Sequence, residues 1–185
     1  MENINYKLIK NRKDLHKWII KDQINSLGRK YPYWELCLHN IIGRLLVEKY
    51  LVFLRHEEYY YNTNHKFLYL FYKIKKNRVG IKTGLEIPKN TVGPGVSAPH
   101  MGSRIINGES KIGENFRIHA NVQIGANGGK PPVLGNNIYI GPGAKLFGDI
   151  YIADNIKIGA NAVVNKSFYE KGITIAGVPA KKVSL

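Results

Sequence analysis

An apolar residue recurs at every sixth position through the second part of this 185-residue chain. Neither the 3.6-residue period of an α-helix nor the two-residue period of a strand fits this spacing. A period of six predicts a prism-like coil, in which each unit supplies one short strand and one corner and points its apolar residue inward. The pattern includes a four-residue insertion after Ile124, and its members are Ile106, Ile112, Ile118, Ile124, Leu134, Ile140, Leu146, Ile152, Ile158 and Val164.

A second set of apolar or small residues lies four positions after members of the first set. It comprises Phe116, Val122, Ile138, Ala144, Ile150, Ile156 and Ala162. Glycine and asparagine tolerate the tight or left-handed backbone that corners need, and asparagine is frequent between the expected strands. The expected corner asparagines are Asn115, Asn136, Asn137, Asn155 and Asn161. These patterns predict a mainly β domain over residues 83–185.

Residues 1–82 have a different composition and predict a helical N-terminal region. They carry 17 of the 28 Lys and Arg residues and 7 of the 13 acids, so their net charge is +10 of the total +15. Asn11 or Asp14 is expected to cap a first helix, and a second is expected over 34–53. The run 66–76 mixes aromatic residues with lysines and fits a helix or a strand. The excess of positive charge indicates an anionic partner.

Composition also excludes several classes of protein. The single cysteine, Cys37, excludes a disulfide framework and a cysteine-based zinc site. The N-terminus is too charged for the apolar core of a signal peptide, and no apolar stretch reaches the length of a spanning helix. We therefore expect a cytoplasmic protein without a metal. A basic, tyrosine-rich first part also fits a nucleic-acid-binding module, but no recognition motif is present, and we expect no nucleic-acid partner.

Four segments resemble the hexapeptide-repeat acyltransferases, and in particular their serine acetyltransferase-like branch, which includes surface-polysaccharide O-acetyltransferases. They begin at Gly84 (Gly-Leu-Glu-Ile-Pro, with Val-Gly-Pro-Gly-Val from Val92), His100 (His-Met-Gly-Ser-Arg-Ile-Ile-Asn), Ile140 (Ile-Gly-Pro-Gly-Ala-Lys-Leu-Phe-Gly-Asp-Ile) and Ile175 (Ile-Ala-Gly-Val-Pro-Ala-Lys-Lys-Val). The resemblance implies a left-handed parallel β-helix, a homotrimer and acetyl-CoA as co-substrate. The γ-class carbonic anhydrases share this fold, but they need three zinc-binding histidines and residues 83–185 hold two.

Acetyl transfer to a hydroxyl needs a base for the hydroxyl proton, and histidine suits neutral pH. His100 leads the segment that resembles the catalytic one, so we assign it as the general base. A carboxylate that orients such a base stabilises its protonated form. The resemblance suggests Glu86 for this role. His119, between Ile118 and Ala120, is expected to point outward, either toward the acceptor or simply into solvent.

Coenzyme A carries phosphates that suit basic side chains near the C-terminus, and its pantetheine arm binds backbone amides in the family that the chain resembles. The positions carried over for the amides are Ala126, Asn127, Ala144 and Ala160, and the candidate phosphate contacts are Lys145, Lys166, Lys181 and Lys182.

The nature of the acceptor is predicted from where the resemblance fails. Serine-specific members place Asp before the catalytic histidine and an Arg-His pair after the inserted loop, whereas this chain has Pro99 and Lys130-Pro-Pro-Val. We therefore mainly expect the acceptor to be a sugar hydroxyl of a surface or capsular polysaccharide. The positive charge of the chain fits an anionic acceptor. Serine O-acetyltransferase and a non-catalytic basic binding or scaffold protein are the alternatives.

The helical region leaves its own alternatives. Its amphipathic runs are expected to pack in the assembly, or else to rest on the inner face of an anionic membrane. The side chains considered for membrane contact are Arg44, Lys49 and Arg55 with the apolar residues Leu45, Leu46, Tyr50, Leu51, Val52 and Phe53.

Overall fold

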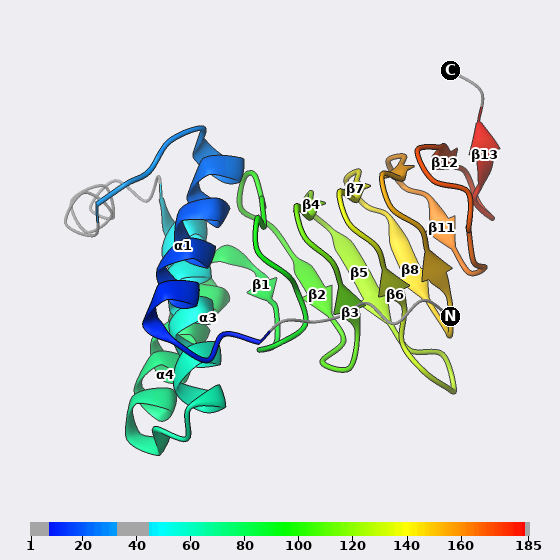
Figure 1. Cartoon of the computed structure of the whole chain (residues 1–185). Helices are drawn as coiled ribbons and strands as arrows, with labels where there is room; N and C mark the ends of the chain where they lie inside the picture. Colours follow the sequence, from blue (N-terminus) through cyan, green and yellow to red (C-terminus); the bar gives the residue numbers. More distant parts are fainter. Residues whose placement is uncertain (1–7, 33–44, 184–185) are drawn as a thin grey trace.

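The computed structural model describes residues 8–32 and 45–183. Its helices are α1 (Arg12–Leu27), α3 (Leu46–Asn62) and α4 (Lys66–Thr83), and they gather at one end of the molecule (Figure 1). The backbone N–H of Asp14 donates to the Asn11 side chain at 2.8 Å, so Asn11 is the N-cap of α1. The stretch 66–76 is helical throughout. The predicted helix over 34–53 lies partly outside the described residues, and Cys37 lies entirely outside them.

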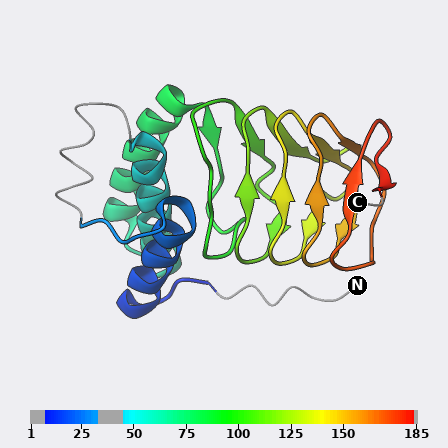
Figure 2. The same ribbon diagram turned by 90° about the horizontal axis from the view of Figure 1, so that it is seen from above.

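A left-handed parallel β-helix extends from the helical end (Figures 1 and 2). Three sheets form its faces, in the orders β1-β2-β5-β8-β11, β3-β6-β9 and β13-β12-β10-β7-β4, and every pairing is parallel except β12 with β13. The strands are β1 (Leu85–Glu86), β2 (Arg104–Ile106), β3 (Lys111–Ile112), β4 (Arg117–Ile118), β5 (Val122–Gly125), β6 (Val133–Leu134), β7 (Tyr139–Ile140), β8 (Lys145–Phe147), β9 (Tyr151–Ile152), β10 (Lys157–Ile158), β11 (Val163–Val164), β12 (Thr174–Ala176) and β13 (Lys181–Val183). The coil predicted from the repeat and the left-handed β-helix implied by the resemblance are both confirmed.

The side chains of the six-residue repeat line the inside of this helix. All ten members of the first apolar set are at most 2% exposed, and all seven of the second set are buried as well. Corners turn at left-handed asparagines, among them Asn115, Asn137 and Asn155. Their side chains form a ladder, with Asn115 donating to Asn137 at 2.8 Å and Asn137 to Asn155 at 2.9 Å. The corner residues thus satisfy one another from coil to coil.

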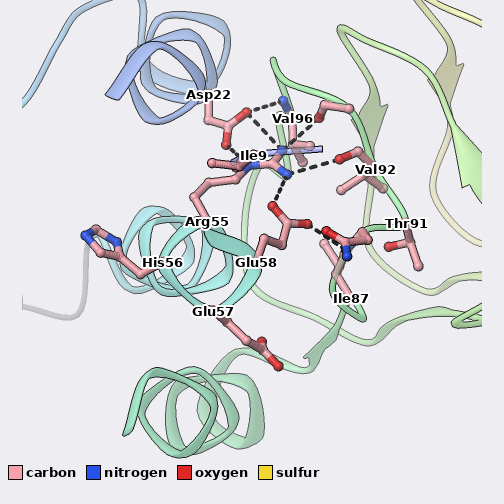
Figure 3. A network of polar contacts seen from close by, with 12 residues as sticks. Ile9, Asp22, Arg55, His56, Glu57, Glu58, Ile87, Thr91, Val92 and Val96 are labelled. Carbon is pink, nitrogen blue, oxygen red and sulfur yellow. Dashed lines mark hydrogen bonds and ion pairs between the residues drawn. The ribbon is translucent and has the colours of Figure 1, made fainter. Parts of the chain in front are cut away.

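A buried ionic network joins α1 and α3 to the first coil (Figure 3). The Arg55 guanidinium, 0% exposed, donates to Asp22 through Nε at 2.7 Å and to Glu58 through Nη1 at 2.9 Å. Asp22 also accepts the backbone N–H groups of Gly95 and Val96, at 2.7 and 2.8 Å. Because the two helices share these contacts with residues 92–96, they fix the segment that leads directly into the candidate site.

Two further contacts of Arg55 complete this network. Its Nη1 donates to the carbonyl of Val92 at 3.0 Å and its Nη2 to that of Gly93 at 2.7 Å. Burial alone lowers the pKa of Arg55, but the charges of Asp22 and Glu58 reverse this and raise the pKa above its ordinary value. The guanidinium is therefore fully charged and completely paired inside the protein.

This arrangement corrects the idea that residues 45–55 rest on a membrane. Arg55 is enclosed in the network, and Leu45, Tyr50, Leu51, Val52 and Phe53 are at most 6% exposed, so this surface is packed inside the protein. Arg44 lies outside the described residues. Among the residues that the structure describes, no helix is both long and apolar enough to cross a membrane.

Candidate functional site at the histidine corner

The candidate base lies at one corner of the β-helix, where residues 97–104 stack on residues 117–121 of the next coil. We call these two segments the histidine corner. Ser97 forms a parallel bridge with Arg117, and the backbone N–H of Asn121 donates to the Ser103 carbonyl at 2.6 Å. Between these points the coils are unequal: seven positions lead from Ser97 to Arg104 (104 − 97), but five lead from Arg117 to Val122 (122 − 117).

The two additional residues explain why His100 is exposed. By the six-residue period, the inward position before Ile106 would be His100. In the structure Ala98 stacks on Ile118 and fills this inward position instead, and it is 0% exposed. His100 lies within the longer corner, with a left-handed φ of +66°. Among residues other than glycine this conformation is uncommon, although histidine is enriched in it. The local geometry presents the imidazole to solvent.

Arg104 holds this corner from within. Its side chain is 0% exposed, and its Nη2 donates to the carbonyls of Pro99 and His100, the latter at 3.1 Å. Its Nη1 donates to Gly102 at 3.3 Å, and its Nε donates to Ile118 of the next coil at 3.1 Å. One buried guanidinium therefore binds the peptide units on both sides of His100 and ties them to the coil above.

The charge of Arg104 has no carboxylate beside it among the described residues. Burial lowers the pKa of Arg104 to about 10, so the guanidinium remains charged near neutral pH. Sequence reasoning missed this residue. The register of the repeat could have identified Arg104. It lies 18 positions, or three periods, before the inward-facing Val122 (122 − 104), so an apolar side chain is expected in its place.

His119 lies in the 117–121 segment of the histidine corner and is partly exposed. The Arg117 Nε donates to the His119 Nε2 at 3.4 Å, and the Arg117 Nη1 donates to Ser97 Oγ, also at 3.4 Å. The His119 ring lies 5.1 Å from that of Tyr139 on the following coil. Burial lowers the pKa of His119, and the positive charges of Arg117, Arg104 and His100 lower it further. The two guanidinium groups near His119 thus favour the neutral form of its imidazole.

Glu86 is on β1, in the coil that ends at residues 97–104 of the histidine corner. It is exposed, it is paired in register with Ile105, and it lines a groove of about 620 Å³ between α4 and the first coil. Within residues 8–32 and 45–183, no hydrogen bond or ion pair joins Glu86 to His100. The proposed orienting role of Glu86 therefore stays a prediction.

The residues predicted for coenzyme A are spread along the β-helix. Ala126 and Asn127 are exposed in the loop between β5 and β6, which projects from the coils (Figure 1), and Ala160 is exposed as well. Ala144 is buried, and its carbonyl already accepts from the Gln123 N–H at 3.2 Å. These contacts with coenzyme A stay predictions.

The lysines predicted to contact the phosphates differ in whether they already bind other groups of the protein. Lys166 and Lys181 are exposed, whereas the Nζ of Lys182 pairs with Glu170 at 2.5 Å. The Nζ of Lys145 donates to the Asn121 carbonyl at 2.5 Å, next to the histidine corner. Lys166 and Lys181 are consequently the freer candidates for a phosphate. The described part of the chain has no group of three or more side chains that would hold a metal ion.

Replacing Arg104 by methionine is expected to lower kcat for the acetyl transfer that the sequence predicts by about 10-fold or more, because the peptide units around His100 lose their shared donor. The Michaelis constant for acetyl-CoA should change little. Steady-state kinetics alongside thermal unfolding would separate the two effects. An R78M variant, altered on the exposed surface of α4, is the control. If R104M lowered the unfolding midpoint but left kcat unchanged, Arg104 would have no positioning role.

The coils and the histidine corner together define a hexapeptide-repeat protein of the acyltransferase type. No protein-family model matches the chain. The serine acetyltransferase of Helicobacter pylori strain ATCC 700392 / 26695 is 39% identical over 107 residues, which are 55% of this chain and 62% of that protein. The serine acetyltransferase of Staphylococcus xylosus is 32% identical over 166 residues, covering 86% of this chain and 74% of that protein.

A solved serine acetyltransferase in complex with CoA has the same fold, with a TM-score of 0.68 and 23% identity over 93% of this chain and 70% of that one. Given the similarity to the Staphylococcus xylosus enzyme over most of both chains, this chain belongs to the serine acetyltransferase family. It spans 62% of the length of the Helicobacter pylori relative.

Proposed function

We propose that the protein is an acetyl-CoA-dependent O-acetyltransferase with His100 as its general base. The observation that carries the proposal is the exposed His100 in a corner two residues longer than the next, with its backbone carbonyl bound by the buried Arg104. Family membership supports both the acyl-transfer reaction and acetyl-CoA as the donor. We further propose a homotrimer, as expected for the family.

In the proposed reaction, the His100 imidazole takes the proton of the acceptor hydroxyl while the hydroxyl oxygen attacks the thioester carbonyl of acetyl-CoA. The tetrahedral oxyanion collapses, the C–S bond breaks, and the thiolate of coenzyme A receives the proton from the imidazolium. The products are the acetyl ester and free coenzyme A, and the base returns to its neutral form.

The relatives favour L-serine as the acceptor over the sugar hydroxyl that the sequence predicted. Pro99 and the loop after Gly129 nevertheless lack the residues that hold serine's charged groups in the family members considered above. A sugar hydroxyl is therefore the second candidate. Either acceptor presents an alcohol to the same base, so the choice between them rests on contacts around His100 rather than on the chemistry.

Incubating the protein with acetyl-CoA and either L-serine or a panel of mono- and oligosaccharides tests the proposal. We expect free coenzyme A to be released with L-serine, at a rate above the rate of acetyl-CoA hydrolysis without acceptor. Thiol detection measures the rate, and mass spectrometry identifies the ester. Acetylation of sugars but not of serine would move the assignment to the second candidate. No transfer to any acceptor would contradict the proposal.

A further inference from the structure

We propose that the outer face of α4 binds the surface of an anionic membrane, with its apolar side chains in the interface and its lysines beside the lipid headgroups. The proposal goes beyond acetyl transfer, because it concerns where the protein works rather than which reaction it performs. It involves other residues than the membrane contact that the sequence suggested, since that surface is packed inside the protein.

Five large apolar side chains of α4 are exposed in the part of the chain that the structure describes. Ile81 is 86% exposed and Phe67 is 80% exposed, and even the least exposed of the five, Phe71, reaches 42%. Spacings of three, four and seven residues place the set along one side of the helix. We call this set the α4 stripe, and its members are Phe67, Leu70, Phe71, Ile74 and Ile81. A continuous row of this kind indicates an interaction surface, whereas single exposed apolar residues do not.

Contacts on the opposite side of α4 hold the stripe outward, at the helical end of the molecule (Figure 1). The Nζ of Lys76 pairs with Glu57 of α3 at 2.6 Å and donates to the Ile87 carbonyl at 3.2 Å. Gly80 packs against the first coil so closely that a Cβ there would lie 2.7 Å from the Leu85 carbonyl oxygen. Rotation of α4 would break the buried ion pair, so the exposed stripe is a fixed feature of the fold.

Positive charge borders the stripe. The 18 residues of α4 include six Lys or Arg and no Asp or Glu. Because each residue turns the helix by about 100°, Lys66 and Lys73 lie along one edge of the stripe and Lys82 lies along the other. All three lysines are exposed. An apolar row between cationic edges is typical of a helix that lies in the interface of an anionic membrane.

Other partners fit the stripe less well. Two copies of this chain that met through the same face would bring their lysines together, and α4 supplies no acidic side chain to pair with them. A nucleic acid would match the lysines, but it would place its charged backbone against Leu70, Ile74 and Ile81. A bilayer surface offers an apolar layer and anionic headgroups to the same helix. The contact lies on the surface, since no described helix is long and apolar enough to cross a membrane.

Co-sedimentation of the full chain with phospholipid vesicles tests the proposal. Vesicles of phosphatidylcholine alone are compared with vesicles that also contain phosphatidylglycerol, at about 0.05 M and about 0.5 M NaCl. We expect wild type to sediment with the anionic vesicles at low salt and only weakly with the neutral ones. Binding should decrease at high salt, because the attraction between lysines and headgroups is screened.

Two variants separate the apolar and the charged parts of the surface. Ile74→Gln removes an apolar side chain from the middle of the stripe and replaces it by a residue that favours helices. We expect it to lower the partition coefficient for anionic vesicles by about 10-fold or more. Lys73→Gln should lower the coefficient by about fivefold at low salt, as for the loss of one cation near the membrane surface. This second loss should largely vanish at high salt.

Ile24→Gln and Lys17→Gln are the matched controls on α1. Ile24 is 46% exposed and Ile74 is 45% exposed, and Lys17 is exposed as Lys73 is. We expect both controls to bind vesicles as wild type does. Circular dichroism and the midpoint of thermal unfolding check that all four variants keep the fold.

The vesicle assay contains neither acetyl-CoA nor an acceptor, so its result is independent of the proposed function. Wild type that stayed in solution with anionic vesicles, or I74Q that bound them as well as wild type, would refute the membrane surface. If wild type did not bind vesicles and light scattering showed a smaller assembly for I74Q, the stripe would be a contact between copies. Loss of oligonucleotide binding in K73Q, without vesicle binding by wild type, would assign the face to a nucleic acid instead.

Discussion

Replacing His100 by asparagine is expected to lower kcat for acetyl transfer by about 100-fold or more, the usual contribution of a general base. Asparagine removes the base but tolerates the left-handed backbone, here at φ +66°, better than alanine does. Arg104 donates to the backbone carbonyls of the corner rather than to the imidazole, so its contacts should survive. The rate of coenzyme A release from acetyl-CoA measures the effect.

The control for this prediction is His16→Asn, which makes the same change at an exposed position on α1. We expect it to retain wild-type activity. Circular dichroism and the midpoint of thermal unfolding should agree between wild type and H100N. Acetyl transfer by H100N at near the wild-type rate would refute the role of His100 as base. His119, the other histidine of the corner, would then be the candidate base.

Replacing Arg55 by methionine is expected to lower the free energy of unfolding by about 3 to 5 kcal/mol, because the buried carboxylates Asp22 and Glu58 lose their counter-ion. The carbonyls of Val92 and Gly93 lose a donor at the same time. Urea unfolding at neutral pH, followed by circular dichroism, measures the loss. The matched control is Lys21→Met on α1, next to Asp22 in the sequence.

Lys21 pairs with Glu114 at 2.5 Å, but the two side chains are 31% and 54% exposed. Removing that pair should cost no more than about 1 kcal/mol. Equal losses in the two variants would show that the Arg55 network does not stabilise the junction between the helices and the first coil.

The destabilisation of R55M should also depend on pH. Burial raises the pKa of Glu58, and the charge and hydrogen bond of Arg55 oppose this rise, so the folded-state pKa should be higher in the variant. A carboxyl group whose pKa is raised by folding binds more protons in the folded state, which makes stability fall as pH increases. R55M should therefore lie closer to wild type at pH 5 than at pH 8, and an equal deficit at both values would contradict this.

The β-helix was predictable because its repeat is one-dimensional. Each coil contacts only its neighbours, so a period of six determines which side chains point inward, as for Ile118 and Ile140. Local chemistry restricted the cap of the first helix to Asn11 or Asp14, and the structure shows that it is Asn11. Residues 66–76 were ambiguous, because their mixture of aromatic residues and lysines fits two periods, and packing against α3 and the first coil decides for a helix.

The contacts of the candidate site required the tertiary structure. The sequence by itself determined the fold and singled out His100, through its resemblance to a catalytic segment. It did not reveal that the corner is two residues longer than the one above, that Arg104 binds the carbonyls around His100, or that Arg117 and His119 meet beside it. Those contacts form between side chains of different coils, and they depend on the rotamer that each side chain adopts. In addition, two helices bring Asp22 and Arg55 to residues 92–96. A linear repeat carries no information on such convergence. The tertiary structure brings the buried guanidinium of Arg104 and the exposed one of Arg117 to the corner that holds the candidate base.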